Sequence, residues 1–151
     1  MKSLIVYFVA IVILIGFKVV YENDMPNYDF EKLVIVTNSD SSFDSEKINN
    51  GNHFYYTFDN IKGKKVLKNL NMSEIEGLVY YFEKDFTIDK IKSKLDFCYS
   101  SQEKIDNLNI FYGYDSSYPD FRYVEGKKVN VQIVENATNF IVGYPMILCG
   151  Y

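Results

Sequence analysis

Histidine and cysteine, the side chains with the most versatile chemistry, are few and widely spaced in this chain. His53 is the only histidine, and Cys98 and Cys149 are the only cysteines. A structural zinc site needs four such ligands at short spacings, and a cysteine–histidine nucleophile pair needs both residues side by side. The sequence shows neither pattern. We therefore expect His53 on the solvent face of a strand and two small, buried cysteines, with a Cys98–Cys149 disulfide as the alternative.

Acidic residues are numerous, but their spacing matches no known cation site. Asp115 and Asp120 lie close together in DSSYPD, which lacks the ligand order of an EF-hand loop. No nucleophile motif or glycine-rich phosphate loop accompanies them. We therefore expect no metal, no cofactor and no catalytic residue.

The charge balance excludes one broad class of partners. The region after Tyr21 holds all 20 acidic residues but only 14 of the 16 basic ones, a net charge of −6. Such a surface repels the phosphates of nucleic acids and of anionic lipids. We therefore expect no nucleic-acid partner.

The segment from Phe111 to Tyr123 is the densest in aromatic residues after the N-terminal region, and it contains the only arginine of the chain. Exposed tyrosine and arginine are enriched where proteins bind partners. The alternative is a hairpin whose rings pack on a sheet. The predicted binding residues are Tyr112, Tyr114, Tyr118, Phe121 and Arg122.

Two amides follow in a segment of alternating character. Asn130 and Gln132 alternate with Val129, Val131 and Ile133, so the amides are expected on the face opposite the valines. They would either hydrogen-bond a ligand or neighbouring strand, or face solvent. The sequence does not choose between these readings.

The beginning of the chain predicts a membrane anchor. Residues 4–21 are almost entirely apolar and as a helix would measure about 27 Å, close to the thickness of a bilayer core. No small-residue cleavage site follows, so we expect residues 1–21 to stay as a single-pass anchor with a cytoplasmic N-terminus. Secretion after signal cleavage is the alternative. Residues 22–31 would be a juxtamembrane linker and 32–151 one extracytoplasmic domain.

Hydrophobic patterns predict an α+β domain, an antiparallel sheet with one or two helices on one face. The expected turn at 60–64 is centred on Gly63. Ser73 and Glu76 fit a capping box, which favours a helix over 75–82 against a strand over 78–82. Strands are expected at 32–37, 53–58, 65–70, 108–114, 129–134 and 140–148, and further helices at 43–50 and 87–97.

The last third of the chain resembles the YwmB family of exported proteins from spore-forming Firmicutes. The resemblance rests on KVNVQI at 128–133, on VGYPMI at 142–147, and on LNIFYGYD at 108–115, within about residues 107–151. It implies a fold similar to the TATA-box-binding protein, a curved antiparallel sheet with helices on its convex side. It implies no DNA binding, because a fold does not determine a function. The family supplies no catalytic residues.

These observations favour a membrane-anchored, non-catalytic domain of the bacterial envelope that binds an envelope protein or a wall component. One alternative is a small envelope enzyme that uses two converging carboxyl groups. A further alternative is nucleic-acid binding by fold analogy, which the charge and the expected location oppose.

Overall fold

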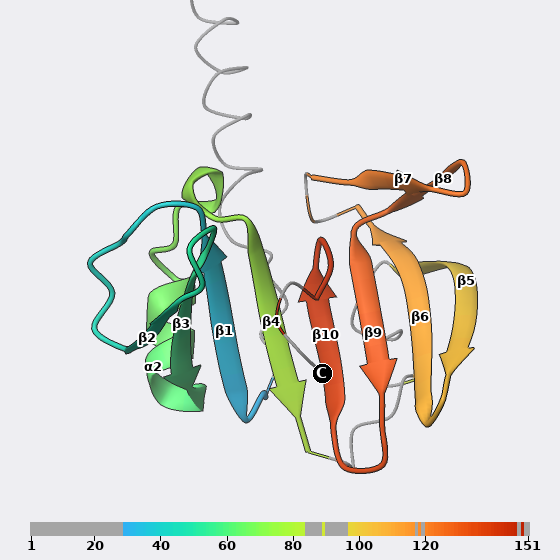
Figure 1. Cartoon of the computed structure of the whole chain (residues 1–151), viewed down its shortest axis with the longest axis horizontal. Helices are drawn as coiled ribbons and strands as arrows, with labels where there is room; N and C mark the ends of the chain where they lie inside the picture. Colours follow the sequence, from blue (N-terminus) through green and yellow to red (C-terminus); the bar gives the residue numbers. More distant parts are fainter. Residues whose placement is uncertain are drawn as a thin grey trace, which may run out of the picture.

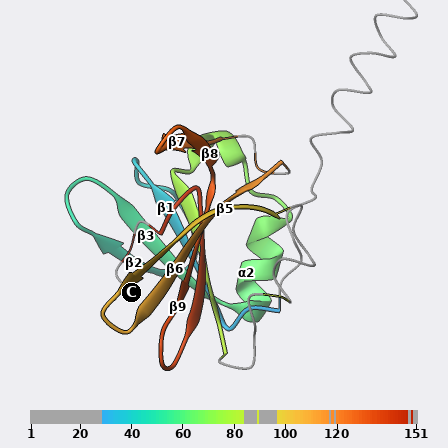
Figure 2. The same cartoon turned by 90° about the vertical axis from the view of Figure 1, so that its right-hand side faces the viewer.

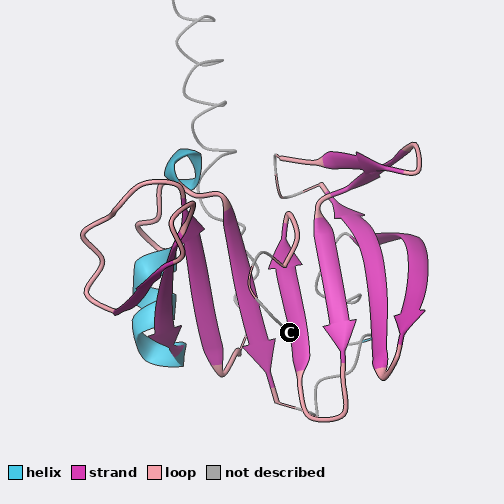
Figure 3. Cartoon of the chain, in the orientation of Figure 1, coloured by secondary structure: helices cyan, strands magenta, loops and turns pink. Residues whose placement is uncertain are grey.

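A computed structural model describes residues 29–83, 89, 97–116, 118, 120–147 and 149. Within these residues, eight strands form one antiparallel sheet in the order β2-β3-β1-β4-β10-β9-β6-β5, and β7 and β8 form a separate ribbon (Figures 1 and 3). The elements are β1 (Lys32–Thr37), β2 (Glu46–Asn49), β3 (Phe54–Asp59), α2 (Asn60–Leu67), the 3-10 turn η1 (Met72–Glu74), β4 (Gly77–Phe82), β5 (Phe97–Ile105), β6 (Leu108–Asp115), β7 (Arg122–Val124), β8 (Lys127–Val129), β9 (Val131–Glu135) and β10 (Phe140–Tyr144).

The coarse prediction of an α+β domain with a large antiparallel sheet and a helix on one face is confirmed. Helix α2 lies to one side of the sheet (Figure 2). Its Gly63 lets the helix approach closely, since a Cβ there would lie 2.9 Å from the Phe30 ring. Phe30 is only 2 % exposed, so the packed domain includes residues before Lys32, within the predicted linker.

The central strands are buried on both faces, which explains their continuous apolar sequences. One face carries the larger core, with Leu33, Tyr80 and Val142 among its members. The opposite face carries Val34, Val79 and other aliphatic residues under part of the C-terminal segment. Both sides of the sheet therefore contribute to stability.

The C-terminal segment crosses this second face at Gly143. A Cβ at Gly143 would lie 2.6 Å from the backbone nitrogen of Ile147, so only glycine fits there. The Ile147 N–H donates to Gln132 Oε1 at 2.9 Å, and Gln132 is 3 % exposed. The solvent-facing reading of this amide is therefore wrong, and Gln132 instead anchors the returning C-terminal segment.

Four predicted strands are confirmed: those at 32–37, 53–58, 108–114 and 129–134 all lie in or overlap observed strands. The last predicted strand is also observed, but β10 ends at Tyr144, before Pro145. β9 and β10 are antiparallel neighbours, as expected.

Helix α2 replaces the turn and strand predicted over 60–70. Asp59 caps it by accepting a hydrogen bond from the Lys62 N–H at 2.8 Å. Aspartate is among the best N-cap residues, so Asp59 indicated the start of a helix. The prediction overlooked it because Gly63 suggested a turn. The glycine serves close packing here rather than a turn.

The helix predicted over 75–82 is wrong, and its rival, a strand, is observed as β4. The apolar spacing at 75, 78, 79 and 82 arises because a strand buried on both faces is apolar at nearly every position. Ser73 does not form a capping box; Asn71 caps the short η1 turn and accepts from the Ser73 N–H.

The helix predicted over 43–50 is also wrong, because Glu46–Asn49 form the edge strand β2. Gly51 has a φ of 91° and belongs to the turn into β3. The predicted helix over 87–97 and the predicted anchor over 4–21 lie outside the described residues, apart from Asp89 and Phe97. No helix among the described residues is long and apolar enough to span a bilayer.

Candidate binding site

The β7–β8 hairpin projects from one end of the sheet (Figure 1). With Phe121 just before it, the hairpin carries the most exposed aromatic rings among the described residues. Its two-residue turn, Glu125 and Gly126, has φ values of 50° and 77°, as in a type I′ turn. Tyr123 is 67 % exposed and Phe121 is 39 % exposed. These exposed rings therefore contribute little to the core of the domain.

Contacts between side chains hold these rings in place. Phe121 contacts Tyr114 edge to face at 6.3 Å and Tyr123 edge to face at 5.6 Å between ring centroids. Lys128 Nζ lies 4.4 Å from the centre of the Phe121 ring, a cation–π distance. The ordered rings lose little conformational entropy when a partner binds. We name Tyr114, Phe121, Tyr123 and Lys128 the hairpin patch.

A buried amide fixes the hairpin to the sheet. The Asp115 N–H donates to Asn130 Oδ1 at 2.7 Å. Asn130 Nδ2 donates to the carbonyl oxygens of Asp115 at 2.7 Å and Tyr118 at 2.9 Å. Asn130 is 0 % exposed, so it supports the loop before the hairpin and is neither solvated nor available to a ligand.

The structure divides the five predicted binding residues. Phe121 and Arg122 are exposed, and Tyr114 is half-buried beside Phe121. Tyr112 is half-buried in the second-face core, and its hydroxyl donates to Glu103 Oε2 at 3.2 Å. Tyr118 is only 2 % exposed and packs against Tyr144, so the expectation of an exposed Tyr118 ring is wrong. Tyr123 and Lys128 were missed, although Tyr123 lies in the same aromatic segment.

Four segments of the chain line a groove beside the hairpin, and we call this groove the end groove. It consists of two open hollows, with cavity volumes of about 660 and 520 Å³, that share Ser73, Ile75 and Glu76. One hollow continues to the Asn38–Phe43 loop, and the other to Asp120–Arg122 and Pro145. Backbone register places these loops at one end of the sheet, because Thr37 ends β1, Gly77 begins β4 and Tyr144 ends β10.

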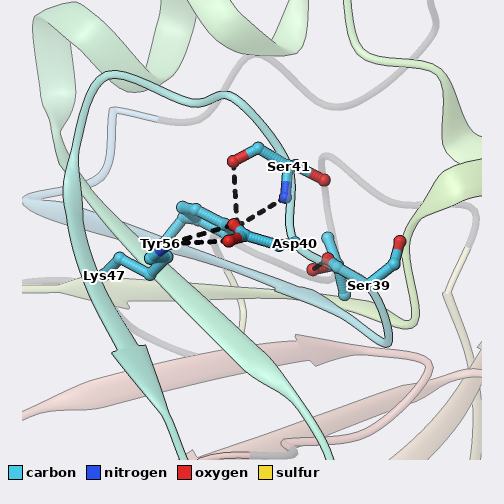
Figure 4. A network of polar contacts seen from close by, with 6 residues as sticks. Ser39, Asp40, Ser41, Lys47 and Tyr56 are labelled. Carbon is cyan, nitrogen blue, oxygen red and sulfur yellow. Dashed lines mark hydrogen bonds and ion pairs between the residues drawn. The ribbon is translucent and has the colours of Figure 1, made fainter.

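A polar network holds the Asn38–Phe43 loop against the sheet (Figure 4). The Ser41 N–H donates to the Tyr56 hydroxyl at 2.7 Å, and that hydroxyl lies 2.7 Å from Asp40 Oδ1. Lys47 Nζ contacts both Asp40 oxygens, at 2.9 and 3.0 Å. The network orders one wall of the end groove.

Charge in this network rules out one catalytic role. Hydrogen bonds from Lys47 and Tyr56 lower the pKa of Asp40, whereas burial raises the pKa of Tyr56. Asp40 is therefore ionised at neutral pH and does not meet the requirement for a protonated general acid.

The two cysteines lie in different parts of the fold, Cys98 in the edge strand β5 and Cys149 in the segment after β10. Cys149 is a free, half-exposed thiol, and its Sγ lies 3.3 Å from the Tyr81 hydroxyl of β4. Cys98 lies in β5, and β10, β9 and β6 separate that strand from β4. The expectation of a small buried side chain is wrong for Cys149.

His53 lies directly before β3 and is half-buried rather than fully solvent-facing. Its ring contacts Tyr55 edge to face at 6.4 Å, and its Nδ1 atom is buried without a hydrogen bond. Among the described residues, no group of three or more His, Cys, Asp or Glu side chains is arranged to hold a metal ion.

Comparison with known proteins assigns no family. No family model matches the chain, and no curated protein or solved structure matches it. The geometry of the hairpin patch and the end groove therefore carries the functional argument.

Proposed function

We propose that this chain is a membrane-anchored domain of the bacterial envelope that binds an envelope partner through the hairpin patch and the end groove. The observation that carries the proposal is the set of ordered, exposed rings of Phe121 and Tyr123 beside a groove. Ordered aromatic side chains next to a hollow are typical of the centres of binding interfaces.

The position of the chain entry supports a site that faces away from the membrane. Asp29 is held by Asn60 and Lys64 of α2, at the end of the sheet where β1 begins. The end groove and the hairpin lie at the opposite end, where β1 ends (Figure 1). Residues 22–28 span at most about 24 Å when extended, so an anchor over 4–21 would keep the domain close to the bilayer.

We also propose that the fold is of the TATA-box-binding-protein type and that the chain is related to the YwmB family. Support comes from the glycine and the two amides of the resembling segment, whose roles are structural. Gly143 admits the returning chain, Gln132 anchors it, and Asn130 ties the loop before the hairpin. Because these three residues support one another's packing, we expect related proteins to keep all three together.

Photo-crosslinking in living cells tests the proposed binding surface. Benzoylphenylalanine in place of Tyr123 is expected to give a discrete adduct with one partner. The matched control places it at Ile61, which is 69 % exposed on α2 at the other end of the sheet. Equal adducts from both positions, or none from position 123, would contradict the proposal.

A further inference from the structure

We propose that the outer face of helix α2 binds the anionic lipid headgroups of the bilayer that holds the N-terminal anchor of the chain. The proposal goes beyond partner binding, because it assigns a separate surface of the domain to a separate ligand. It rests on the proposed anchor and not on the hairpin patch or the end groove.

Helix α2 covers one side of the sheet, so one of its faces packs inward and the other is turned outward (Figure 2). On the inner face, Gly63 packs closely on the Phe30 ring, and Val66 and Leu67 pack against the larger core. The residues on the opposite face follow the i, i+3, i+4, i+7 spacing of neighbours on a helix surface. They are Ile61, Lys64, Lys65 and Lys68, which we name the basic face.

The positive charge of the basic face is only partly compensated. No acidic residue lies within α2, and Lys64 Nζ contacts Asp29 Oδ1 at 3.0 Å. Lys65 and Lys68 are exposed, and neither forms an ion pair with another described residue. The net negative charge of the domain is therefore unevenly distributed, and this face attracts anions that the domain as a whole repels.

Ile61 adds an apolar side chain to this surface. It is 69 % exposed, the highest value among the large hydrophobic side chains of the described residues. Helices that lie at a membrane interface combine lysines with apolar side chains that enter the headgroup region. A soluble polyanion would leave Ile61 in water, so a lipid surface fits the basic face better.

The start of the described chain lies beside the basic face. Asp29 accepts hydrogen bonds from Asn60 Nδ2 at 3.2 Å and from Lys64 Nζ at 3.0 Å. Because residues 22–28 span at most about 24 Å, an anchor over 4–21 would hold the basic face close to the bilayer. The tether raises the local concentration of headgroups around this face. Each lysine near an anionic surface strengthens binding about fivefold.

The absence of tryptophan from the chain permits a direct assay in the full-length protein. Ile61→Trp places the only tryptophan on the basic face, and tryptophan is itself favoured at membrane interfaces. The protein is reconstituted in nanodiscs of phosphatidylcholine, with or without phosphatidylglycerol, that contain the same fraction of nitroxide-headgroup lipid. Phosphatidylglycerol is expected to increase the quenching at position 61. Higher ionic strength should remove this increase, because salt screens the attraction.

Two double variants with equal changes of charge separate the basic face from general electrostatics. In the Ile61→Trp chain, Lys65→Gln with Lys68→Gln should abolish the increase that phosphatidylglycerol causes. Lys104→Gln with Lys127→Gln removes the same charge from exposed positions in β5 and β8, away from α2, and should preserve the increase. Thermal unfolding of each variant verifies that the fold is retained.

Quenching that does not depend on phosphatidylglycerol, or equal effects of the two double variants, would overturn the inference. If adducts at position 123 still form with one partner in that case, the proposed partner binding stands and this inference alone fails. Loss of the adducts with the lipid dependence intact would refute the partner-binding surface alone. A chain that does not associate with nanodiscs would refute the anchor and this inference together.

Discussion

On the second face of the sheet, the C-terminal segment packs directly on Gly143, where there is no room for a side chain. Gly143→Ala places a Cβ 2.6 Å from Ile147 N and Cγ1, and the nearest atoms include backbone that cannot rotate away. We expect a loss of about 3 kcal/mol in the free energy of unfolding, at the upper end for overpacking. Urea denaturation measures it.

The Gln132–Ile147 hydrogen bond provides the internal control for Gly143→Ala. Both residues hold the same returning segment, so Gln132→Ala should destabilise on its own but add less in a Gly143→Ala background. Strict additivity of the two losses, or a neutral Gly143→Ala, would contradict this account of the C-terminal segment.

The Asp40 network should make the order of its loop depend on pH. The folded pKa of Asp40 lies below its usual value of 3.8, so its contribution is complete above that value and is lost as the pH falls through the folded pKa. The pKa of Lys47 is raised above 10.5, chiefly by its hydrogen bond with Asp40, so the Lys47 contribution is lost at high pH. The loop should be most ordered between about pH 4 and 10.

Hydrogen-exchange protection of the Ser41 amide reports this order, because that amide donates to the Tyr56 hydroxyl. Asp40→Asn should abolish the acid-side loss of protection, and Tyr56→Phe should lower protection at every pH. An unchanged acid limb in Asp40→Asn would assign the loss of protection to other carboxyl groups.

At the scale of elements, the hairpin turn limits how firmly the patch is held. Glu125 has a φ of 50°, which a glutamate adopts at a cost and an asparagine adopts more readily. Glu125→Asn should stabilise the hairpin by a few tenths of a kcal/mol, and Gly126→Ala should destabilise it by about 1 kcal/mol. Exchange protection of the amides in β7 and β8 measures both changes. Opposite signs would mean that the turn is not type I′.

The elements also show which sequence patterns were informative. Lys32–Thr37 was predicted correctly because its run of five β-branched or apolar residues, from Leu33 to Thr37, is too short for a buried helix. Gly77–Phe82 was ambiguous, because burial on both faces removes the alternation that distinguishes a strand. α2 was missed because a glycine in a polar segment suggests a turn, whereas Gly63 lies in a helix that packs closely against Phe30 and Leu33. That contact depends on Phe30, which is remote in sequence.

The candidate site was predictable only in part, for a related reason. The aromatic segment marked Phe121 and Arg122 correctly as exposed, since composition indicates where binding residues gather. It did not separate them from Tyr118, because the turn of the chain after Asp115 directs that ring into the core beside Tyr144. The end groove joins segments that are more than 20 residues apart in the sequence, so no local pattern indicates it.

In the whole molecule, we expect one end of the sheet to lie near the membrane and the other end to point away from it. The chain enters beside α2, and the hairpin patch lies at the far end. If residues 4–21 anchor the chain, the seven residues between Tyr21 and Asp29 keep the α2 end nearer the bilayer. A partner-binding end would then point away from the lipid and towards the wall.

Fluorescence quenching in the full-length chain tests this orientation. Ile61→Trp and Tyr123→Trp each introduce the sole tryptophan at an exposed position, one at either end of the sheet. In nanodiscs that contain lipids with nitroxide headgroups, the tryptophan at position 61 should be quenched more strongly, because nitroxide quenching requires close approach. Stronger quenching at position 123 would place the hairpin on the membrane and make the bilayer itself its partner. A chain that does not associate with nanodiscs at all would instead refute the anchor, while the geometry of the hairpin and the groove would remain unaffected.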